Sequence, residues 1–381
     1  MTESLAIISG KGGSGKTTLA ISLAQLLATC EKRVLLVDCD MSTHGATYFF
    51  EGHLTQKRKY VTFVDFINGE HFKENSNVKK EILQVSPNIE FIPSCVDFPS
   101  KSFSYEKMNK MMLHNFDELI HSDAPYDIVI FDCQAGYSTA TDAVTKFAKK
   151  KLAVTEADAI SASSLRVLYS QLSEQLDNGQ TYQIFNKITK EEQDVYSKLT
   201  HGTLFTNLTP ILFDWNVRKA FITNDLPNID ASNPSLTNSI YDLAIALFPS
   251  YKKELRKFII NVKEKMLSTL ESKRLEIKYE RNRKKSSYMF DLVIPIITSI
   301  ITAIPLFYII VERPSFFDDS TFSSALVGAV IASIVVSFIW MFIKRHSDVG
   351  NRKKRFMLQK EEQLKEEIYQ LQSTLDFNHH S

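Results

Sequence analysis

Nine consecutive residues near the N-terminus combine four glycines, two lysines and three hydroxyl side chains, a combination that suits phosphate binding. Glycines let the backbone bend so that successive N–H groups point inward, and a following helix N-terminus adds partial positive charge. Lys16 can reach the β- and γ-phosphates of a nucleotide, and the Thr17 hydroxyl can bind Mg²⁺. The segment is Gly10, Lys11, Gly12, Gly13, Ser14, Gly15, Lys16, Thr17 and Thr18. It predicts a phosphate-binding loop; a glycine-rich turn with surface lysines is the alternative.

Carboxylates follow two other apolar runs. Asp38 and Asp40 come after the run at 34–37, and Asp132 comes after the run at 128–131. Continuous branched apolar residues suit parallel strands that are covered on both faces. The carboxyl ends of such strands are where open α/β sheets bind ligands. These acids are therefore candidates for nucleotide and metal chemistry, although Asp38 and Asp40 could instead cap the next turn or helix.

The elements that must position these residues alternate between strands and helices. The phosphate-binding loop joins an apolar run at 5–8 to an amphipathic segment that begins at Leu19. Residues 1–250 continue this alternation, which predicts an α/β domain with a doubly wound, mostly parallel sheet of about seven strands. A chain of this length can bury one large core. The polar connection at 42–88 predicts an insertion with a short helix at 61–67.

The loop resembles the deviant Walker A motif of the ParA/MinD family of P-loop ATPases, because Lys11 directly follows the first glycine. The resemblance covers roughly residues 1–250 and implies the cofactors ATP and Mg²⁺. It implies that Lys11 reaches across a nucleotide sandwich dimer to the partner's phosphates, and that Asp40 orients the attacking water. The catalytic residues so implied are Lys11, Lys16 and Asp40, and the metal residues are Thr17, Asp38 and Asp132, the aspartates acting through water.

The same resemblance assigns three further residues to the nucleotide. The Gly136 amide is expected to meet the γ-phosphate, although Gln134 stands where family members often carry proline and leaves the switch geometry open. Asn186 follows the strand at 182–185 and resembles the adenine-reading asparagine, since an amide can both donate to and accept from the base edge. Pro227 is expected to pack on adenine, with a plain turn proline as the alternative. These three join residues 10–18 in the expected ATP-binding set.

Two long uncharged segments lie in the C-terminal third. Residues 292–311 and 322–343 contain no charged side chain. At about 1.5 Å per helical residue, each segment would span about 30 Å, the thickness of a hydrocarbon core. Helices of a soluble domain are rarely apolar on every face over such a length. The sequence therefore predicts a transmembrane helical hairpin, with a hydrophobic hairpin buried in a soluble oligomer as the alternative.

The flanking charges predict the orientation of this hairpin. Basic residues precede the first span at 281–285 and follow the second at 344–355, whereas the short loop at 312–321 carries one arginine against three acids. By the positive-inside rule, both basic flanks face the cytoplasm. The N-terminus has no signal peptide, because its only apolar run is the first strand. We therefore expect a two-span protein of the cell inner membrane whose ATPase domain and both termini are cytoplasmic.

Charged helices are expected on either side of the hairpin. Apolar residues recur at spacings of four and three within 251–285 and within 356–377, which indicates two narrow seams that would pair as an antiparallel stalk. The alternative is that both helices lie on anionic lipid, since residues 251–288 are strongly basic. The expected domains are 1–250 (ATPase), 251–288 (basic helix or stalk), 289–311 (first span), 312–321 (external loop), 322–343 (second span) and 344–381 (cytoplasmic helix).

Composition narrows the range of partners. The chain has 45 basic and 44 acidic residues, so charge gives no evidence for nucleic-acid binding. Its four cysteines lack a C-x-x-C spacing, so neither a zinc site nor a disulfide framework is predicted. The expected partners are a second copy in a nucleotide-dependent homodimer, the lipid bilayer and an unidentified protein.

Two functions from different classes fit these observations. The first is a membrane-anchored ATPase switch that recruits or positions a partner at the membrane. The second is a membrane effector whose hairpins reorganise or permeabilise the bilayer under ATPase control. Small residues at 323–333 supply close helix packing for the second function. A tyrosine kinase of the polysaccharide-assembly type is disfavoured, because such kinases carry their spans before the P-loop.

Overall fold

The computed structural model describes residues 2–54, 60–68, 81–95, 126–189, 205–223 and 225–276, with isolated positions elsewhere. The chain divides into two compact units, Met1–Glu264 and Lys265–Ser381, and each is described by itself. Apart from isolated positions, the expected spans at 289–311 and 322–343 and the loop between them lie outside the described residues. Within the part that is described, we find no helix with both the length and the apolar character needed to cross a membrane.

The first unit is built on an eight-stranded sheet with the strand order β3-β4-β2-β5-β1-β6-β7-β8. All neighbouring strands are parallel except β3, which runs antiparallel to β4. The strands are β1 (Glu3–Ser9), β2 (Val34–Asp38), β3 (Leu83–Ser86), β4 (Ile89–Ile92), β5 (Ile128–Ala135), β6 (Lys150–Thr155), β7 (Gln180–Phe185) and β8 (Thr206–Asn207). The expected mostly parallel α/β sheet is confirmed, with eight strands where about seven were expected.

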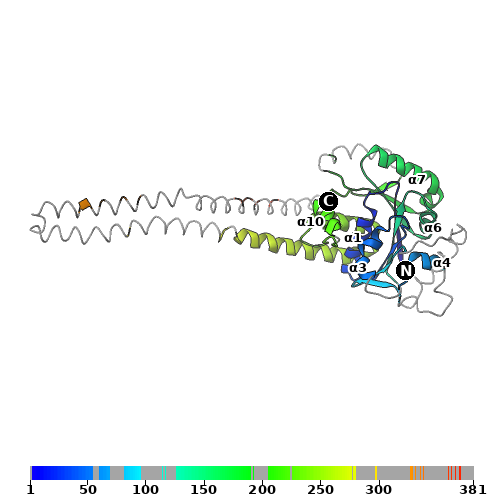
Figure 1. The fold of residues 1–381 in the computed structure, drawn as a ribbon, viewed down its shortest axis with the longest axis horizontal. Coiled ribbons are helices and arrows are strands. Elements are labelled where there is room, and N and C mark those ends of the chain that lie inside the picture. Colours follow the sequence, from blue (N-terminus) through cyan, green and yellow to red (C-terminus); the bar gives the residue numbers. More distant parts are fainter. Residues whose placement is uncertain are drawn as a thin grey trace, which may run out of the picture. The chain divides into compact units, whose positions relative to one another are not determined.

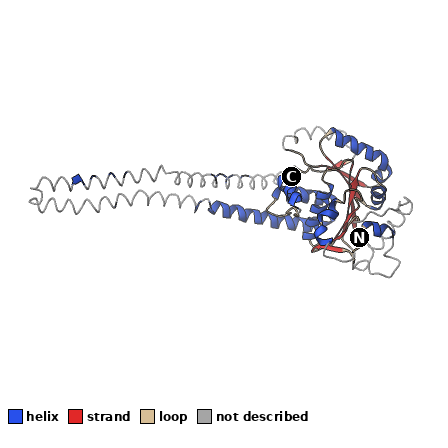
Figure 2. Cartoon of the chain, in the orientation of Figure 1, coloured by secondary structure: helices blue, strands red, loops and turns tan. Residues whose placement is uncertain are grey.

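Helices cover both faces of this sheet (Figures 1 and 2). α1 and α10 lie on one face, and α4, α6 and α7 lie on the other (Figure 1). The helices are α1 (Lys16–Thr29), α2 (Gly45–Phe49), α3 (Glu51–Leu54), α4 (Phe63–Asn68), α6 (Thr139–Phe147), α7 (Ala159–Asp177), α9 (Trp215–Thr223) and α10 (Pro234–Leu247), followed by a 3₁₀ turn (Pro249–Tyr251) and a helix at 252–276. The sheet is therefore doubly wound, as expected.

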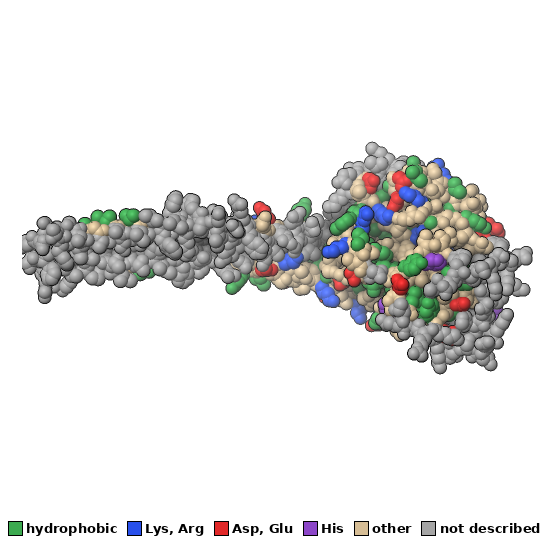
Figure 3. All heavy atoms as spheres, in the orientation of Figure 1, with side chains coloured by type: hydrophobic (Ala, Val, Ile, Leu, Met, Phe, Trp, Pro, Cys, Tyr) green, Lys and Arg blue, Asp and Glu red, His purple; other side chains and the backbone are tan. Residues whose placement is uncertain are grey.

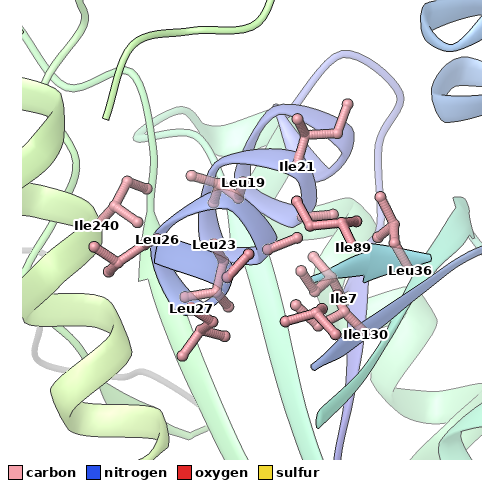
Figure 4. Close-up of a cluster of buried hydrophobic side chains, with 14 of the residues drawn as sticks. Ile7, Leu19, Ile21, Leu23, Leu26, Leu27, Leu36, Ile89, Ile130 and Ile240 are labelled. Carbon is pink, nitrogen blue, oxygen red and sulfur yellow. The ribbon is translucent and has the colours of Figure 1, made fainter. Parts of the chain in front are cut away.

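Helix α1 is buried on nearly all sides because it lies between the sheet and α10. Its leucines, with Leu23 among them, pack near Ile7 and Ile130 of the sheet, and Leu26 lies beside Ile240 of α10 (Figure 4). Each such side chain contributes about 1.5–3 kcal/mol on burial. This packing holds the N-terminus of α1 in a fixed place at the carboxyl ends of the strands.

The insertion at 42–88 contains the short helix expected at 61–67, which the structure places at Phe63–Asn68. The start of α4 is fixed by a reciprocal cap. The Asp65 N–H donates to the Thr62 hydroxyl at 3.1 Å, and the Thr62 N–H donates to the Asp65 carboxylate at 3.0 Å. The boundary therefore follows the capping pair rather than the first apolar residue.

The helix at 252–276 buries one narrow stripe of apolar side chains. Leu255, Ile259 and Val262 of the first unit are buried, whereas Ile260 between them is 54 % exposed. Met266 and Leu270 of the second unit are also buried. Figure 3 shows basic, acidic and hydrophobic side chains intermixed on one face of the first unit. Within the described residues, the buried side chains of this helix thus form a narrow apolar stripe.

Candidate functional site

The phosphate-binding loop connects β1 to α1 at the carboxyl edge of the sheet. Gly13 and Gly15 have positive φ values of 79° and 96°, which only glycine adopts without strain. Lys16 is only 7 % exposed, and its ammonium donates to the Ser9 hydroxyl at 2.9 Å. That hydroxyl in turn donates to the Lys11 carbonyl at 2.8 Å. Lys16 is therefore held inside the loop, where it can neutralise a phosphate.

Two glycines are required by close approach to the loop. A Cβ on Gly15 would collide with the Asn186 amide, and a Cβ on Gly45 would lie 3.0 Å from the Thr17 hydroxyl. Gly45 opens α2, so this helix begins directly against the expected metal-binding threonine. The loop after Asp40 and the phosphate-binding loop are thus packed together, although they are distant in sequence.

Two buried carboxylates lie side by side, because Asp38 of β2 is paired in register with Asp132 of β5. Both carboxylate oxygens of Asp132 are buried, and among the described residues neither has a donor within full hydrogen-bond geometry. Burial raises the pKa of Asp132, while the neighbouring Thr17 hydroxyl and the Lys16 charge act in the opposite direction. Burial and the charge on Asp132 likewise raise the pKa of Asp38. Both carboxylates are thus buried beside each other, with the Lys16 ammonium as a nearby positive charge.

These features fit a divalent cation. Orphaned oxygens are costly to bury, and a cation beside Asp132 would relieve that cost. Mg²⁺ prefers hard oxygen donors such as carboxylates, hydroxyls, water and nucleotide phosphates. Thr17 and Asp132 supply two donors of that kind, and Asp38 supplies negative charge behind them. The residues present are those that a magnesium site needs.

Asp38 is oriented by donors from the loop that follows it. Its carboxylate accepts hydrogen bonds from the Thr47 N–H at 2.8 Å, the Thr47 hydroxyl at 2.6 Å and the Asp40 N–H at 3.0 Å. The Ser94 N–H donates to the same Thr47 hydroxyl at 2.9 Å, and the Ser94 hydroxyl lies 2.7 Å from His44 Nδ1. This chain of hydrogen bonds links the end of β4 to the carboxylate pair.

Asp40 is tied into its own turn. One carboxylate oxygen accepts from the N–H groups of Ser42 and Thr43 at 3.0 and 2.8 Å, and the other accepts from the Thr43 hydroxyl at 2.5 Å. The turn-capping interpretation is therefore correct for the geometry. It does not exclude the catalytic one, because a carboxylate oxygen has more than one lone pair and these donors fix its direction.

Gly136 and Asn186 lie at the loop but hold other partners in this conformation. The Gly136 N–H donates to the Ser9 carbonyl at 2.8 Å, so it would have to release that bond to meet a phosphate. The Asn186 amide donates to the Ser14 carbonyl at 2.8 Å and is buried. Pro227 is buried in the segment before α10, and its contact with a base stays a prediction. The structure thus brings Asn186 to the phosphate-binding loop.

Lys11, unlike Lys16, is paired with acids that follow β6. Its ammonium lies 3.1 Å from a Glu156 carboxylate oxygen and 3.6 Å from Asp158. Glu156 also accepts from Lys187 at 2.8 Å, and Lys187 donates to the Gly13 carbonyl as well. These acids follow β6 directly, so the rule that ligands bind at strand ends could have drawn attention to them. No motif marked Thr47, Ser94 or Glu156, and Lys187 was part of the Asn186 motif without a role of its own, because their contacts arise across the fold.

Comparisons with known proteins agree with this fold. The family described as "AAA domain" matches residues 2–181. The chromosome partitioning protein ParA of Caulobacter vibrioides is 34 % identical over 139 residues, which cover 36 % of this chain and 49 % of that protein. The septum site-determining protein MinD of Bacillus subtilis is 28 % identical over 155 residues, or 41 % of this chain and 53 % of MinD. The chain thus spans about half the length of these curated relatives.

Solved structures resemble the fold over a longer stretch. MinD from the MinC:MinD cell division complex of Aquifex aeolicus aligns with a TM-score of 0.54 at 21 % identity, covering 65 % of this chain and 96 % of that one. MinD of Pyrococcus horikoshii complexed with Mg-ADP aligns with a TM-score of 0.50 at 20 % identity, covering 67 % and 99 %. The expected ParA/MinD-type P-loop fold is therefore confirmed.

Proposed function

We propose that this ParA/MinD-type P-loop ATPase hydrolyses ATP with Mg²⁺ and acts as a nucleotide switch that recruits or positions a partner at a membrane. One observation carries the nucleotide chemistry. A buried Lys16 and the orphaned carboxylate of Asp132 lie at one end of a glycine loop, so that a polyphosphate and a cation would satisfy both. The similarity to ParA and MinD proteins supports the same assignment.

The residues of this chain divide the chemistry between them. Lys16 and the loop N–H groups bind the β- and γ-phosphates, and Thr17 and Asp132, with Asp38, hold Mg²⁺, the aspartates acting through water. When bound, Mg²⁺ neutralises charge that develops on the phosphates. Asp40 is fixed by three hydrogen bonds and orients the attacking water. Asn186 and Pro227 contact adenine at the other end of the nucleotide.

The position of Lys11 supports a sandwich homodimer. Its ammonium is paired with Glu156 outside its own loop, so it is placed to serve a phosphate other than the one that Lys16 binds. Two copies facing each other would each complete the partner's site in this way. ATP would then promote dimer formation, and hydrolysis would end it.

Membrane attachment is proposed from the sequence. The two uncharged segments with basic flanks favour a two-span anchor in the cell inner membrane, with the ATPase domain and both termini in the cytoplasm. Anchoring in one plane raises the effective concentration of the ATPase domains and so favours the dimer.

Helices on the cytoplasmic side would connect the anchor to the ATPase domain as a stalk. Met266 is buried on the predicted seam of the first helix, and Leu270, four residues further on, is buried as well. In the second, Glu362, Lys365 and Tyr369 are helical and exposed. Helical geometry puts Glu362 and Tyr369 on the side away from the predicted seam at 364, 368, 371 and 375, and puts Lys365 at its flank. Disulfide trapping across the two seams tests this pairing against lipid contact.

The proposal is tested by affinity purification of the full chain from membranes. Asp40→Ala should retain ATP in a closed dimer, whereas Lys16→Ala should not bind ATP tightly. A protein captured by Asp40→Ala and absent with Lys16→Ala would support a recruitment switch. Equal ATP hydrolysis by Asp40→Ala and the unchanged chain would refute the role of Asp40.

The membrane-effector function makes a different prediction. Small side chains at 323–333 would allow the second spans of several copies to pack closely. Vesicles that contain the full chain would then leak a trapped dye when ATP is added, and would not leak with Lys16→Ala. Dye retention together with ATP-dependent capture of a partner would favour the switch.

A further inference from the structure

One carboxylate in the first unit is shared by two lysines. The Glu156 oxygen Oε2 lies 3.1 Å from the Lys11 ammonium, and Oε1 lies 2.8 Å from the Lys187 ammonium. Asp158 adds a second negative charge at 3.6 Å from Lys11. Burial raises the pKa of Glu156, but the hydrogen bonds from Lys187 and Lys11 outweigh it and hold this pKa below its usual value. Glu156 is thus ionised and paired on both sides.

The two anions are fixed by the elements around them. Asp158 caps α7, because its carboxylate accepts from the Ser161 N–H at 2.8 Å and from the Ser161 hydroxyl at 2.7 Å. Glu156 stands between this cap and the end of β6. Lys11, in contrast, sits on the glycine loop with its side chain 38 % exposed. Asp158 is thus held by the helix that it caps, whereas Lys11 reaches both acids from the glycine loop.

Lys187 is held beside Glu156 by contacts with the glycine loop. It directly follows Asn186 in a left-handed conformation with φ of 60°, and its ammonium also donates to the Gly13 carbonyl. Asn186 donates to the next carbonyl, that of Ser14. Consecutive residues after β7 therefore bind consecutive carbonyls of the loop, and Lys187 stays beside Glu156 wherever Lys11 goes.

We propose that Glu156 is a positioning residue that holds Lys11 in the single protomer, and that Lys187 keeps Glu156 paired when Lys11 moves to the nucleotide of a second copy. The inference rests on the proposed sandwich dimer and adds its regulation. With Lys11 in place, the cluster balances two cations against two anions. After Lys11 leaves, Lys187 still neutralises Glu156, so the release does not leave two carboxylates without a cation.

The signs of two substitutions follow from this arrangement. Glu156→Gln weakens the hold on Lys11 and should lower the ATP concentration for half-maximal dimerisation. Lys187→Met removes one of the two cations from Glu156, which then pairs with Lys11 alone. This variant should raise the ATP concentration for half-maximal dimerisation. The groups are partly exposed, so each change should be about twofold to fivefold. In the Glu156→Gln background, Lys187→Met should have little further effect on that concentration. With Glu156 in place, Lys187→Arg should behave like the unchanged chain, because it keeps the positive charge.

The experiment measures association of the full chain in detergent by energy transfer between labelled copies, in an Asp40→Ala background that prevents turnover. Glu254→Gln is the matched control, because Glu254 forms a 2.7 Å ion pair with Lys32 elsewhere in the first unit. Lys187 also contacts the loop through Gly13, so ATP affinity is measured separately in a Lys11→Ala background. There, neither substitution can act through release of Lys11.

The outcomes separate this inference from the proposed function. If copies of the Asp40→Ala chain do not associate with one another when ATP is added, the sandwich dimer itself is wrong. If it associates but Glu156→Gln shifts the midpoint no more than Glu254→Gln, the positioning role of Glu156 is wrong. If Lys187→Met acts equally with Glu156 present or replaced, or changes ATP affinity in the Lys11→Ala background, Lys187 acts on the loop and not through Glu156.

Discussion

The carboxyl edge of the sheet and the helix at 252–276 use side chains in opposite ways. At the carboxyl edge, buried polar groups such as Asp38, Thr47 and Lys16 have specific partners at hydrogen-bond distance. Along the helix, Leu255, Ile259 and Val262 are buried by apolar packing that repeats every three or four residues. At the edge, the identity of each atom matters, whereas along the helix, volume and spacing matter.

This difference determines what a substitution reveals. Hydrogen bonds are directional, and removing one partner leaves the other unsatisfied in a buried place. Hydrophobic burial is not directional, and a core accepts a different side chain of similar volume. The carboxyl edge should therefore lose function with the fold intact, and the helix should lose stability with the site chemistry intact.

The largest expected effect is on the helix. Leu255→Ala should lower the free energy of unfolding by about 2–5 kcal/mol, because it opens a cavity at a fully buried position of the core. Ile260→Ala, one turn away and exposed, should change it by no more than about 0.5 kcal/mol. Chemical denaturation of both variants measures this contrast, and equal losses would contradict the narrow stripe.

The next effect concerns the phosphate-binding loop. Lys16→Ala should weaken ATP binding about a hundredfold, because it removes charge-assisted hydrogen bonds at a buried site. Isothermal titration with a non-hydrolysable ATP analogue measures the affinity. Circular dichroism should be unchanged, and a variant that binds ATP normally would place the phosphates elsewhere.

A smaller effect is expected at Thr47, whose hydroxyl and N–H both donate to Asp38. Thr47→Val keeps the shape but removes the hydroxyl, which should cost about 1–3 kcal/mol of stability and raise the Mg²⁺ concentration needed for ATP hydrolysis. Thr47→Ser retains the hydroxyl and serves as the control. If the serine variant were as impaired as the valine variant, the methyl group and not the hydrogen bond would be responsible.

The smallest effect is a pH dependence of the metal-free protein. The pKa of Asp38 is raised to about 7, and that of Asp132 to about 6, first of all by burial. Between about pH 4 and 7 the folded protein therefore binds more protons than the unfolded chain, and stability falls as pH rises. Melting temperatures in EDTA should be lower at pH 8 than at pH 5.

Two comparisons test that assignment. Asp38→Asn cannot ionise and should reduce the pH dependence of the melting temperature. Mg²⁺ with nucleotide should raise the melting temperature most at pH 8, where both carboxylates are charged. A metal-free chain that is equally stable at both pH values would show that the pKa values of the two carboxylates are not raised in the folded protein.

Much of the fold could be read from local pattern. The apolar runs at 5–8, 34–37 and 128–131 became β1, β2 and β5, because fully covered parallel strands require continuous apolar sequence. The helix at 61–67 was found within two residues, since its start depends on the Thr62–Asp65 cap. The two-residue β8, which pairs with β7, is too short to give a periodic pattern.

The residues of the candidate site differ in the same way in how well the sequence predicts them. Glycines and Lys16 are adjacent in sequence, and their geometry follows from one loop, so the sequence could name them. Thr47 and Glu156 lie far from that loop along the chain, and nothing in their neighbours marks them. Asn186 was expected to read adenine, and only the structure shows that its amide also binds the Ser14 carbonyl.

The sequence by itself determined the strand–loop–helix unit at residues 3–29, the carboxylates at the strand ends and the periodic face of the helix at 252–276. Each of these depends on residues within a few positions of one another. The tertiary structure alone decided that Asp38 is paired with Asp132, that Ser94 supports Thr47, and that Glu156 holds both Lys11 and Lys187. Those contacts join residues tens of positions apart, and only the strand order of the sheet brings them together.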